Sequence, residues 1–224
     1  MAIRRHKIQV KFNPYHGRDG RFTSGPGGGG APRRSIHSDT AAAVTDFTRL
    51  GYGPVRSYQS AGQKLAQQTE RIRNSGMSPN HQAHAIAQIT QEHNARMANV
   101  PLRVRQNAAL IESHISASAP HVGIIHRGIR FDGNATTTFH PGNTISMGGT
   151  SSWSTSRRTA NSFSSGFGQR VVFTVRNRTG VNISQLSIRR VESEVLVSNT
   201  ASFRVISARP TASGRILNVR VEEI

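Results

Sequence analysis

Three short groups of polar residues in the C-terminal half of the chain have the side-chain types for shared chemistry. The first is residues 126–128 (His-Arg-Gly), at the end of an apolar segment, and the second is residues 153–156 (Trp-Ser-Thr-Ser). The third is residues 191–196, which contain a Glu-x-Glu pair. An arginine fork can bind phosphates, and a carboxylate can stabilise developing positive charge. Each group alone is common, so the prediction of a site rests on their order, spacing and flanking strands.

In that order and spacing, the groups resemble the R-S-E clade of mono-ADP-ribosyltransferases, which includes bacterial toxins and phage-encoded enzymes, over roughly residues 121–224. Residues 180–187 also lie where that family has the strand leading into its third motif. The resemblance implies an α+β fold, with a core of two packed, mainly antiparallel β-sheets and an N-terminal helical layer. It implies that NAD is a consumed substrate, and the chain has no Gly-x-Gly-x-x-Gly fingerprint of a Rossmann-type NAD site.

The resemblance also implies a role for each group. Arg127 is expected to hold the phosphates of NAD, and Gly128, lacking a Cβ, lets the backbone approach the nicotinamide amide. Ser154, at the end of a strand, is expected to position the nicotinamide ribose and to orient the catalytic glutamate. Glu194 is that glutamate, whose carboxylate would bind the ribose 2′-hydroxyl and stabilise the cation formed as the glycosidic bond breaks.

Further residues near these groups are expected to contact NAD or to pack beside it. Thr155 and Ser156 complete the serine and threonine group as NAD contacts. Phe167, on a loop with glycine on both sides, could fold over bound NAD, although a loop aromatic is more often a simple hydrophobic contact. Trp153 and Phe163 are expected to be packing residues near the pocket.

The acceptor of the transferred group depends on Glu192. On a strand, Glu192 and Glu194 would point to the same face and titrate as a coupled pair. In the family that the chain resembles, a glutamate at the first of these positions accompanies transfer to arginine, since a carboxylate can hold the guanidinium and take its proton. A protein arginine, in a host protein, is therefore the expected acceptor. Without the other two groups, the pair would be interpreted as two ordinary edge-strand charges.

The composition limits the other possible partners and cofactors. There is no cysteine, and His81 and His84 are spaced for a metal but have no third ligand pattern, so no metal site is expected. The formal charge of +18 favours anionic partners, which leaves nucleic acid open as a non-specific partner or as the acceptor. No segment has the pattern of a signal peptide or of a membrane-spanning helix, so a soluble chain without membrane contact is expected.

The chain divides into three parts by composition. Residues 1–36 are expected to be a basic, Gly/Pro-rich disordered arm, in which residues 12–22 resemble a segment of phage head-morphogenesis proteins. Residues 37–120 are expected to be the helical N-terminal part of the domain, and residues 121–224 the β-rich catalytic core that binds NAD. The arm leaves open a non-enzymatic interpretation, an inert transferase fold in a virion or DNA-associated structural protein.

Periodicity predicts the elements of these parts. Apolar stripes indicate helices over 55–72, 79–100 and 104–115; residues 74–76 end the first, and Ser78 and Pro79 begin the second. Strands are predicted over 121–126, 170–175, 192–197, 203–207 and 216–221, and a short helix over 157–164. Helices that precede a strand-rich body argue for α+β rather than alternating βαβ units.

Overall fold

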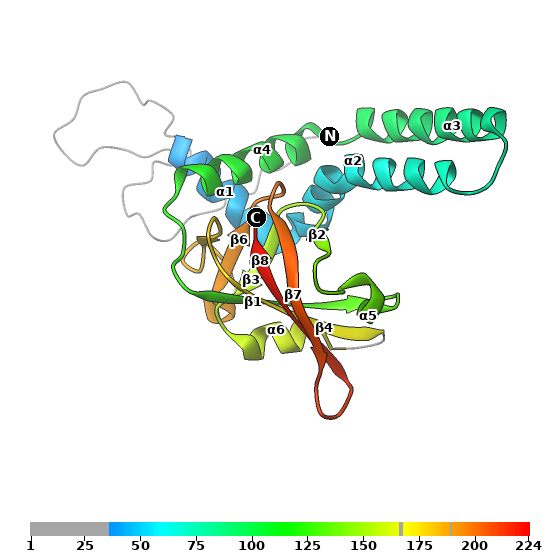
Figure 1. Ribbon diagram of the computed structural model, residues 1–224. Coiled ribbons are helices and arrows are strands. Elements are labelled where there is room, and N and C mark those ends of the chain that lie inside the picture. The colour runs from blue at the N-terminus through cyan, green and yellow to red at the C-terminus, as the bar shows by residue number, and fades with distance from the viewer. Residues whose placement is uncertain (1–35, 166–167, 189) are drawn as a thin grey trace, which may run out of the picture.

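The computed structural model describes residues 36–165, 168–188 and 190–224 (Figure 1). The predicted N-terminal arm, with its phage-like segment, therefore lies outside the described residues, except for Ile36, which begins the first helix. The NAD contact predicted for Phe167 also lies outside them. No helix in the described ranges is both long enough and apolar enough to cross a membrane.

Four α-helices form the N-terminal layer, and one short π-helix joins the first two. Their bounds are α1 (Ile36–Asp46), η1 (Phe47–Gly51), α2 (Tyr52–Arg73), α3 (Pro79–Ala98) and α4 (Leu102–Ala117). The three predicted helices are confirmed as α2, α3 and α4, and Ser78 caps α3 by accepting a hydrogen bond from the backbone N–H of His81. Helix α1 was not predicted, because its run of alanines has little apolar periodicity.

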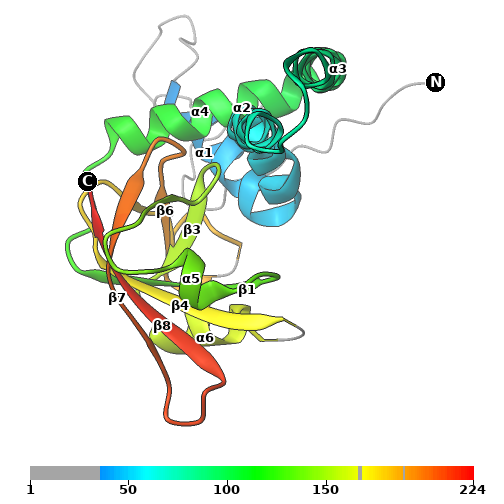
Figure 2. The same ribbon diagram turned by 45° about the vertical axis from the view of Figure 1, so that its right-hand side comes forward.

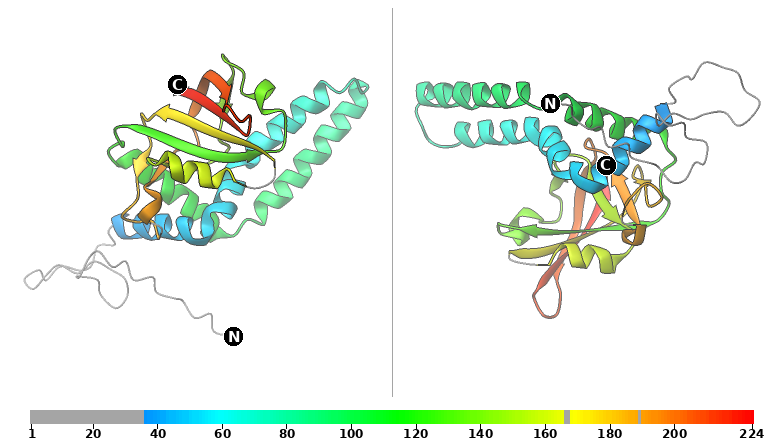
Figure 3. Two further views of the ribbon diagram at one scale, coloured as in Figure 1. Left: turned by 90° about the horizontal axis from the view of Figure 1, so that it is seen from below. Right: turned by 180° about the vertical axis from the view of Figure 1, so that it is seen from behind.

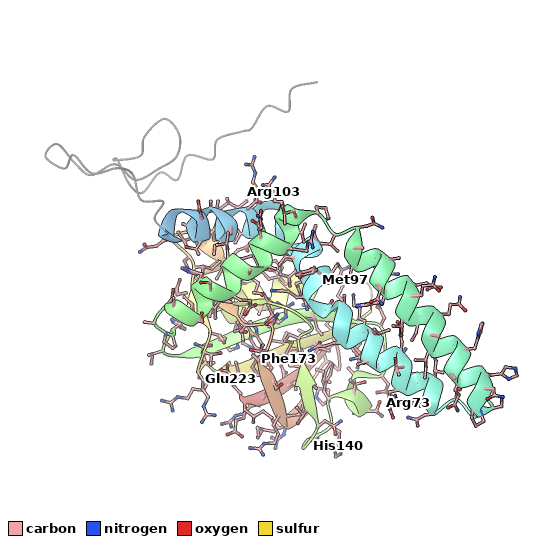
Figure 4. All side chains as sticks on the ribbon, turned by 90° about the horizontal axis from the view of Figure 1, so that it is seen from above. Arg73, Met97, Arg103, His140, Phe173 and Glu223 are labelled. Carbon is pink, nitrogen blue, oxygen red and sulfur yellow. The ribbon has the colours of Figure 1, made fainter. Side chains whose placement is uncertain are left out.

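Helices α2 and α3 form an antiparallel hairpin that projects from the body of the molecule (Figure 1; Figure 3, right). Helix α3 has no buried residue, and the buried residues of α2, Val55 and Ser60, lie in its first half. Arg73 therefore lies at the far end of the hairpin, away from the sheet (Figure 4). The first half of α2 belongs to the body, and its second half is exposed with α3.

In the described part of residues 124–223, eight strands follow the helices, with three short helical segments between them. The strands are β1 (Ile124–Phe131), β2 (Thr144–Ser146), β3 (Ser151–Ser154), β4 (Gln169–Arg176), β5 (Val181–Asn182), β6 (Glu194–Val197), β7 (Ser202–Pro210) and β8 (Ile216–Glu223). The helical segments are α5 (Ala135–Thr138), α6 (Arg157–Phe163) and η2 (Arg190–Glu192). The sheet order is β2-β7-β8-β4-β1-β3-β6-β5, and among the strand pairs of the described residues only β4–β8 is parallel.

The sheet folds over so that its two halves enclose the larger core (Figure 2). Trp153 on β3 lies 5.3 Å from Phe203 on β7, ring centroid to centroid, although three strands separate β3 from β7 in the sheet. Trp153 and Phe173 on β4 are 6.4 Å apart across the same core. The predicted α+β architecture is confirmed, and the two packed sheets are halves of one hydrogen-bonded sheet. The aromatic rings buried between the halves, together with the aliphatic side chains around them, stabilise this arrangement.

The helical layer packs on the opposite face of β5 and β6. Val44, Phe47 and Ile111 lie in a second cluster with Val181 and Leu196, and all five are buried. Because α1, α2 and α4 cover this end of the sheet, the first turn of α2 comes close to the strands that carry the predicted catalytic groups. The fold thus brings a part of the helical layer to the candidate site.

Candidate active site

A pocket of about 280 Å³ lies where β1 and β3 diverge, beside the helical layer and α6. All three groups found in the sequence contribute to its wall. The lining residues are Thr48, Tyr52, His126, Arg127, Gly128, Ser152, Trp153, Ser154, Ala160, Phe163, Glu192 and Glu194. The fold therefore brings together side chains that lie up to 146 positions apart, counted from Thr48 to Glu194.

The strand register explains why these residues meet. His126 on β1 lies opposite Ser154 on β3, and Ser154 lies opposite Glu194 on β6. Directly opposed residues of neighbouring strands share a face of the sheet, so the three side chains form one row. His126 and Ser154 are the only paired residues of β1 and β3, and beyond them the strands separate. That separation opens the pocket.

Arg127 fills the gap between the separating strands and is 7% exposed. One terminal nitrogen donates to the carbonyl oxygen of Ser152, and Nη2 donates to the hydroxyl of Tyr52 at 2.7 Å. Its Nε atom is buried and has no hydrogen-bond partner among the described residues. Arg127 thus joins β1, β3 and α2, and Nε is a donor that a bound anion can satisfy.

Tyr52 was not found by sequence analysis, although it accepts hydrogen bonds from two arginines. Arg56 Nη1 donates to its hydroxyl at 2.9 Å, in addition to the bond from Arg127. Burial by itself would raise the pKa of Tyr52, but the positive charges of the two arginines and their hydrogen bonds together lower it. Tyr52 lies three positions before Val55, where the predicted helix over 55–72 begins, so the sequence analysis did not include it.

Glu194 begins β6 and is 6% exposed, which is rare for a carboxylate. Burial raises the pKa of its carboxyl group, and the negative charge of Glu192 acts in the same direction. Hydrogen bonds from Ser152 and Ser187, and the charge of Arg127, oppose this rise. The carboxylate is therefore held in place by hydroxyl donors at a site where its charge is only partly neutralised, and its pKa lies above the ordinary value.

The hydroxyl that contacts Glu194 belongs to Ser152, not to Ser154 as the sequence analysis expected. Ser152 Oγ donates to Glu194 Oε1. Ser154 Oγ donates to the backbone oxygen of Glu192 at 2.6 Å and accepts from the backbone N–H of Ser156 at 3.0 Å. Ser154 therefore orients the backbone that leads to Glu194. Ser152 was missed because nothing in the sequence fixes which serine on this face of β3 reaches the carboxylate.

The expectation that Glu192 and Glu194 both lie on one strand is wrong. Glu192 ends the 3-10 segment η2, and the strand begins only at Glu194. Between them, Ser193 has φ of +47°, a left-handed conformation that is uncommon for a residue other than glycine. The backbone N–H of Thr155 donates to the Ser193 oxygen at 3.1 Å and helps to hold this turn. Both carboxylates still line the pocket, but the turn, not strand periodicity, places them there.

Gly128 has a packing role that the sequence did not reveal. A Cβ at this position would lie 1.7 Å from the carbonyl oxygen of Ala160 on α6, so only glycine permits the approach of α6 to β1. Ser156 caps the same helix by accepting from the backbone N–H of Thr159 at 3.3 Å. Together these contacts fix α6 beside β1 (Figure 3, left), where it forms one wall of the pocket.

The two aromatic residues predicted to pack near the pocket both line it. Trp153 is 2% exposed and belongs to the core between the halves of the sheet, as expected. Phe163, on α6, is 50% exposed, so it forms part of the rim of the pocket more than part of a core. A partly exposed ring at a pocket rim offers an apolar surface to a ligand.

A family model described as NAD:arginine ADP-ribosyltransferase matches residues 60–223. The chain belongs to this family. As a member, it has an ADP-ribosyltransferase domain that consumes NAD as a substrate, and the family resemblance seen in the sequence is confirmed at this level. No curated protein sequence matches the chain.

Solved structures of ADP-ribosyltransferases share its fold. The Vis toxin of Vibrio splendidus is 21% identical with a TM-score of 0.59, over 84% of this chain and 74% of that chain. An ADP-ribosyltransferase of Clostridium botulinum is 16% identical with a TM-score of 0.52, over 82% of this chain and 85% of that chain. The C3 exoenzyme of Clostridium limosum is 13% identical with a TM-score of 0.52, over 84% of this chain and 85% of that chain.

Proposed function

We propose that the protein is an arginine-directed mono-ADP-ribosyltransferase of the R-S-E clade, which transfers ADP-ribose from NAD to an arginine of a target protein. The main support for this proposal is that Arg127 lines one pocket together with two serines of β3 and two carboxylates (Ser152, Ser154, Glu192 and Glu194). The family match supports NAD as the donor, and a Vis structure in complex with agmatine supports a guanidinium as the acceptor.

In this proposal, the reaction begins with cleavage of the bond between nicotinamide and the ribose C1′ atom. The bonding electrons leave with nicotinamide, and positive charge develops on the ribose. Glu194 accepts a hydrogen bond from the ribose 2′-hydroxyl and stabilises this charge, for which its carboxylate must be ionised. Ser152 holds that carboxylate in position by donating to it.

Glu192 serves the acceptor in the second half of the reaction. A guanidinium is almost always protonated and is a poor nucleophile, so it needs a base as it attacks C1′. Glu192 holds the guanidinium and takes the proton that its nitrogen loses when the new C–N bond forms. The turn at Ser193, which places Glu192 beside the pocket, supports this division of roles.

The diphosphate of NAD is assigned to Arg127, whose buried Nε has no acceptor within the described part of the chain. Gly128 and Ser154, which line the pocket, are assigned to the nicotinamide riboside half of NAD. Thr155 and Ser156 are assigned to NAD as well; they directly follow Ser154, although they are not among the residues that line the pocket. Phe167, which lies outside the described residues, is proposed as a further contact of NAD.

The charge of +18 favours a second candidate, transfer to nucleic acid, because a positive field attracts an anionic acceptor. Labelled NAD is incubated with the purified chain and each class of acceptor: agmatine, cell lysate proteins and nucleic acid. Arginine transfer predicts labelled agmatine, and labelled proteins whose modified residue is arginine by mass spectrometry. Label that nuclease removes and protease spares would favour the second candidate. No transfer and no release of nicotinamide would favour an inert transferase fold, such as a virion or DNA-associated structural protein.

A further inference from the structure

The face of the sheet that carries the candidate site continues beyond the pocket, across β4 and β8. Thr174 on β4 lies opposite His126, and Arg220 on β8 is the register partner of Thr174. A hydrogen-bond distance of 3.0 Å between His126 Nδ1 and Thr174 Oγ1 confirms that these side chains share a face. One row therefore runs from Glu194 through Ser154, His126 and Thr174 to Arg220.

At the β8 end of this row lies a concave surface of about 890 Å³, which we term the basic-apolar face. Three aliphatic side chains line it and are unusually exposed: Val122 at 87%, Ile124 at 57% and Ile206 at 43%. Arg176 and Arg220, both exposed, lie among them. Exposed aliphatic groups gathered on one surface, with arginines between them, are typical of protein-binding sites.

The positive charges of Arg176 and Arg220 on this face are not paired with its own carboxylates. Arg204 pairs with Glu222 at 2.9 Å, and Arg178 donates to the backbone oxygen of Glu223 at 2.8 Å. Over the described ranges, the guanidinium groups of Arg176 and Arg220 have neither a hydrogen bond nor an ion pair. The two carboxylates that line the face are already engaged, Glu222 by Arg204 and Glu223 by Arg178 and Thr179. Arg176 and Arg220 therefore stay available to carboxylates of a partner.

We propose that the basic-apolar face docks an acidic segment of the protein acceptor, whose arginine then reaches the pocket along the row of side chains. This proposal rests on the proposed transfer to protein arginine. A protein segment fits better than nucleic acid, because the face offers aliphatic side chains and no aromatic ring on which a base could stack. Docking away from the pocket would give the enzyme a preference among arginines that the pocket alone cannot give.

The geometry sets the spacing of the acidic residues from the arginine. Four strand spacings separate β6, which carries Glu194, from β8, which carries Arg220. At about 4.8 Å for each spacing, the path along the outer face of the sheet is about 19 Å, and an extended peptide that follows this face covers it in about six residues. The acceptor is therefore expected to carry carboxylates about six positions from the modified arginine.

Two synthetic peptides test the proposal with the full chain. One carries a single arginine and a cluster of aspartates about six positions away, and the other has asparagines in place of the aspartates. Fluorescence anisotropy at low salt should show at least about fivefold tighter binding of the aspartate peptide, and the difference should shrink as salt is added. The double substitution Arg176→Glu/Arg220→Glu should abolish the preference. Arg71→Glu/Arg73→Glu, the same change of charge on the exposed part of α2, should keep it.

Transfer rates with agmatine separate docking from catalysis. The Arg176→Glu/Arg220→Glu chain should modify agmatine at the wild-type rate and lose at least about fivefold in kcat/KM for the aspartate peptide. The milder Arg176→Gln/Arg220→Gln chain replaces it if the double reversal impairs folding. Equal binding of both peptides by the wild-type chain, or a preference that survives removal of both arginines, would overturn the proposal. A wild-type chain that binds the aspartate peptide selectively but transfers nothing would support the docking face while contradicting the proposed function.

Discussion

Replacing Ser152 by alanine isolates the hydroxyl that holds the catalytic carboxylate in our proposal. Ser152 Oγ donates to Glu194 Oε1, and this bond lowers a pKa that burial raises. A hydrogen bond to a charged group contributes about 1.5–3 kcal/mol, which corresponds to about 10- to 150-fold in rate if the bond matters fully in the transition state. Ser152→Ala is therefore expected to lower kcat at neutral pH by about that factor.

The pH dependence of the variant gives a sharper result than its rate. Activity requires ionised Glu194, so the rate falls as the pH falls through the pKa of this group. Loss of the Ser152 donor raises that pKa further, because the donor favours the charged form. The acid limb of the kcat profile of Ser152→Ala should therefore lie at higher pH than that of the wild-type chain.

The assay is the initial rate of nicotinamide release, measured against pH at saturating NAD and agmatine. Ser151→Ala is the matched control, because Ser151 accepts a hydrogen bond from Trp153 Nε1 at 2.9 Å on the core face of the same strand. The control should lose some stability and keep the wild-type pH profile. An unchanged acid limb in Ser152→Ala, or the same displacement in both variants, would refute the role given to Ser152.

Three further variants test the role of Glu192, the packing of Gly128 and the burial of Glu194. Glu192→Gln should lower the rate of transfer to agmatine by about 10²–10⁴-fold. It should leave the rate of NAD hydrolysis, measured as nicotinamide release without agmatine, unchanged. Equal losses of both rates would contradict the separate role of Glu192. Gly128→Ala should destabilise the chain by about 1–3 kcal/mol or more, since its Cβ would lie 1.7 Å from the Ala160 oxygen; an unchanged melting temperature would be inconsistent with this packing. Because the folded chain raises the pKa of Glu194, folding becomes less favourable as pH rises above the unfolded value. The melting temperature of Glu194→Gln at neutral pH should therefore be higher than that of the wild-type chain, by about 2–4 °C for each kcal/mol gained in the free energy of unfolding. This difference should shrink in acid.

Local signals in the sequence were sufficient for much of the fold. The Ser78 cap with Pro79 marks the start of α3, and apolar periodicity marks α2 and the long strands β4 and β8. The three polar groups that the sequence singled out all line one pocket. These features are encoded over a few residues, so they need no knowledge of the tertiary structure.

The details of the site depend on contacts between distant segments, and the sequence did not reveal them. Tyr52 reaches the pocket only because α2 packs over β6, and the choice of Ser152 as the partner of Glu194 depends on side-chain placement across β3 and β6. The turn at Ser193 replaces a predicted strand, because its left-handed backbone cannot be inferred from a serine between two glutamates. Gly128 shows the same limit, since its reason for lacking a Cβ is a helix that begins 29 positions later, at Arg157.

The most direct test of the central claim is the rate of nicotinamide release from NAD by wild-type and Glu194→Gln chains, with and without agmatine. Glutamine keeps the size and the hydrogen-bond acceptor of Glu194 but not the negative charge that is proposed to stabilise the ribose cation. We expect the variant to lose about 10²–10³-fold in kcat, with NAD binding by calorimetry little changed. A Glu194→Gln chain that releases nicotinamide at the wild-type rate would contradict it.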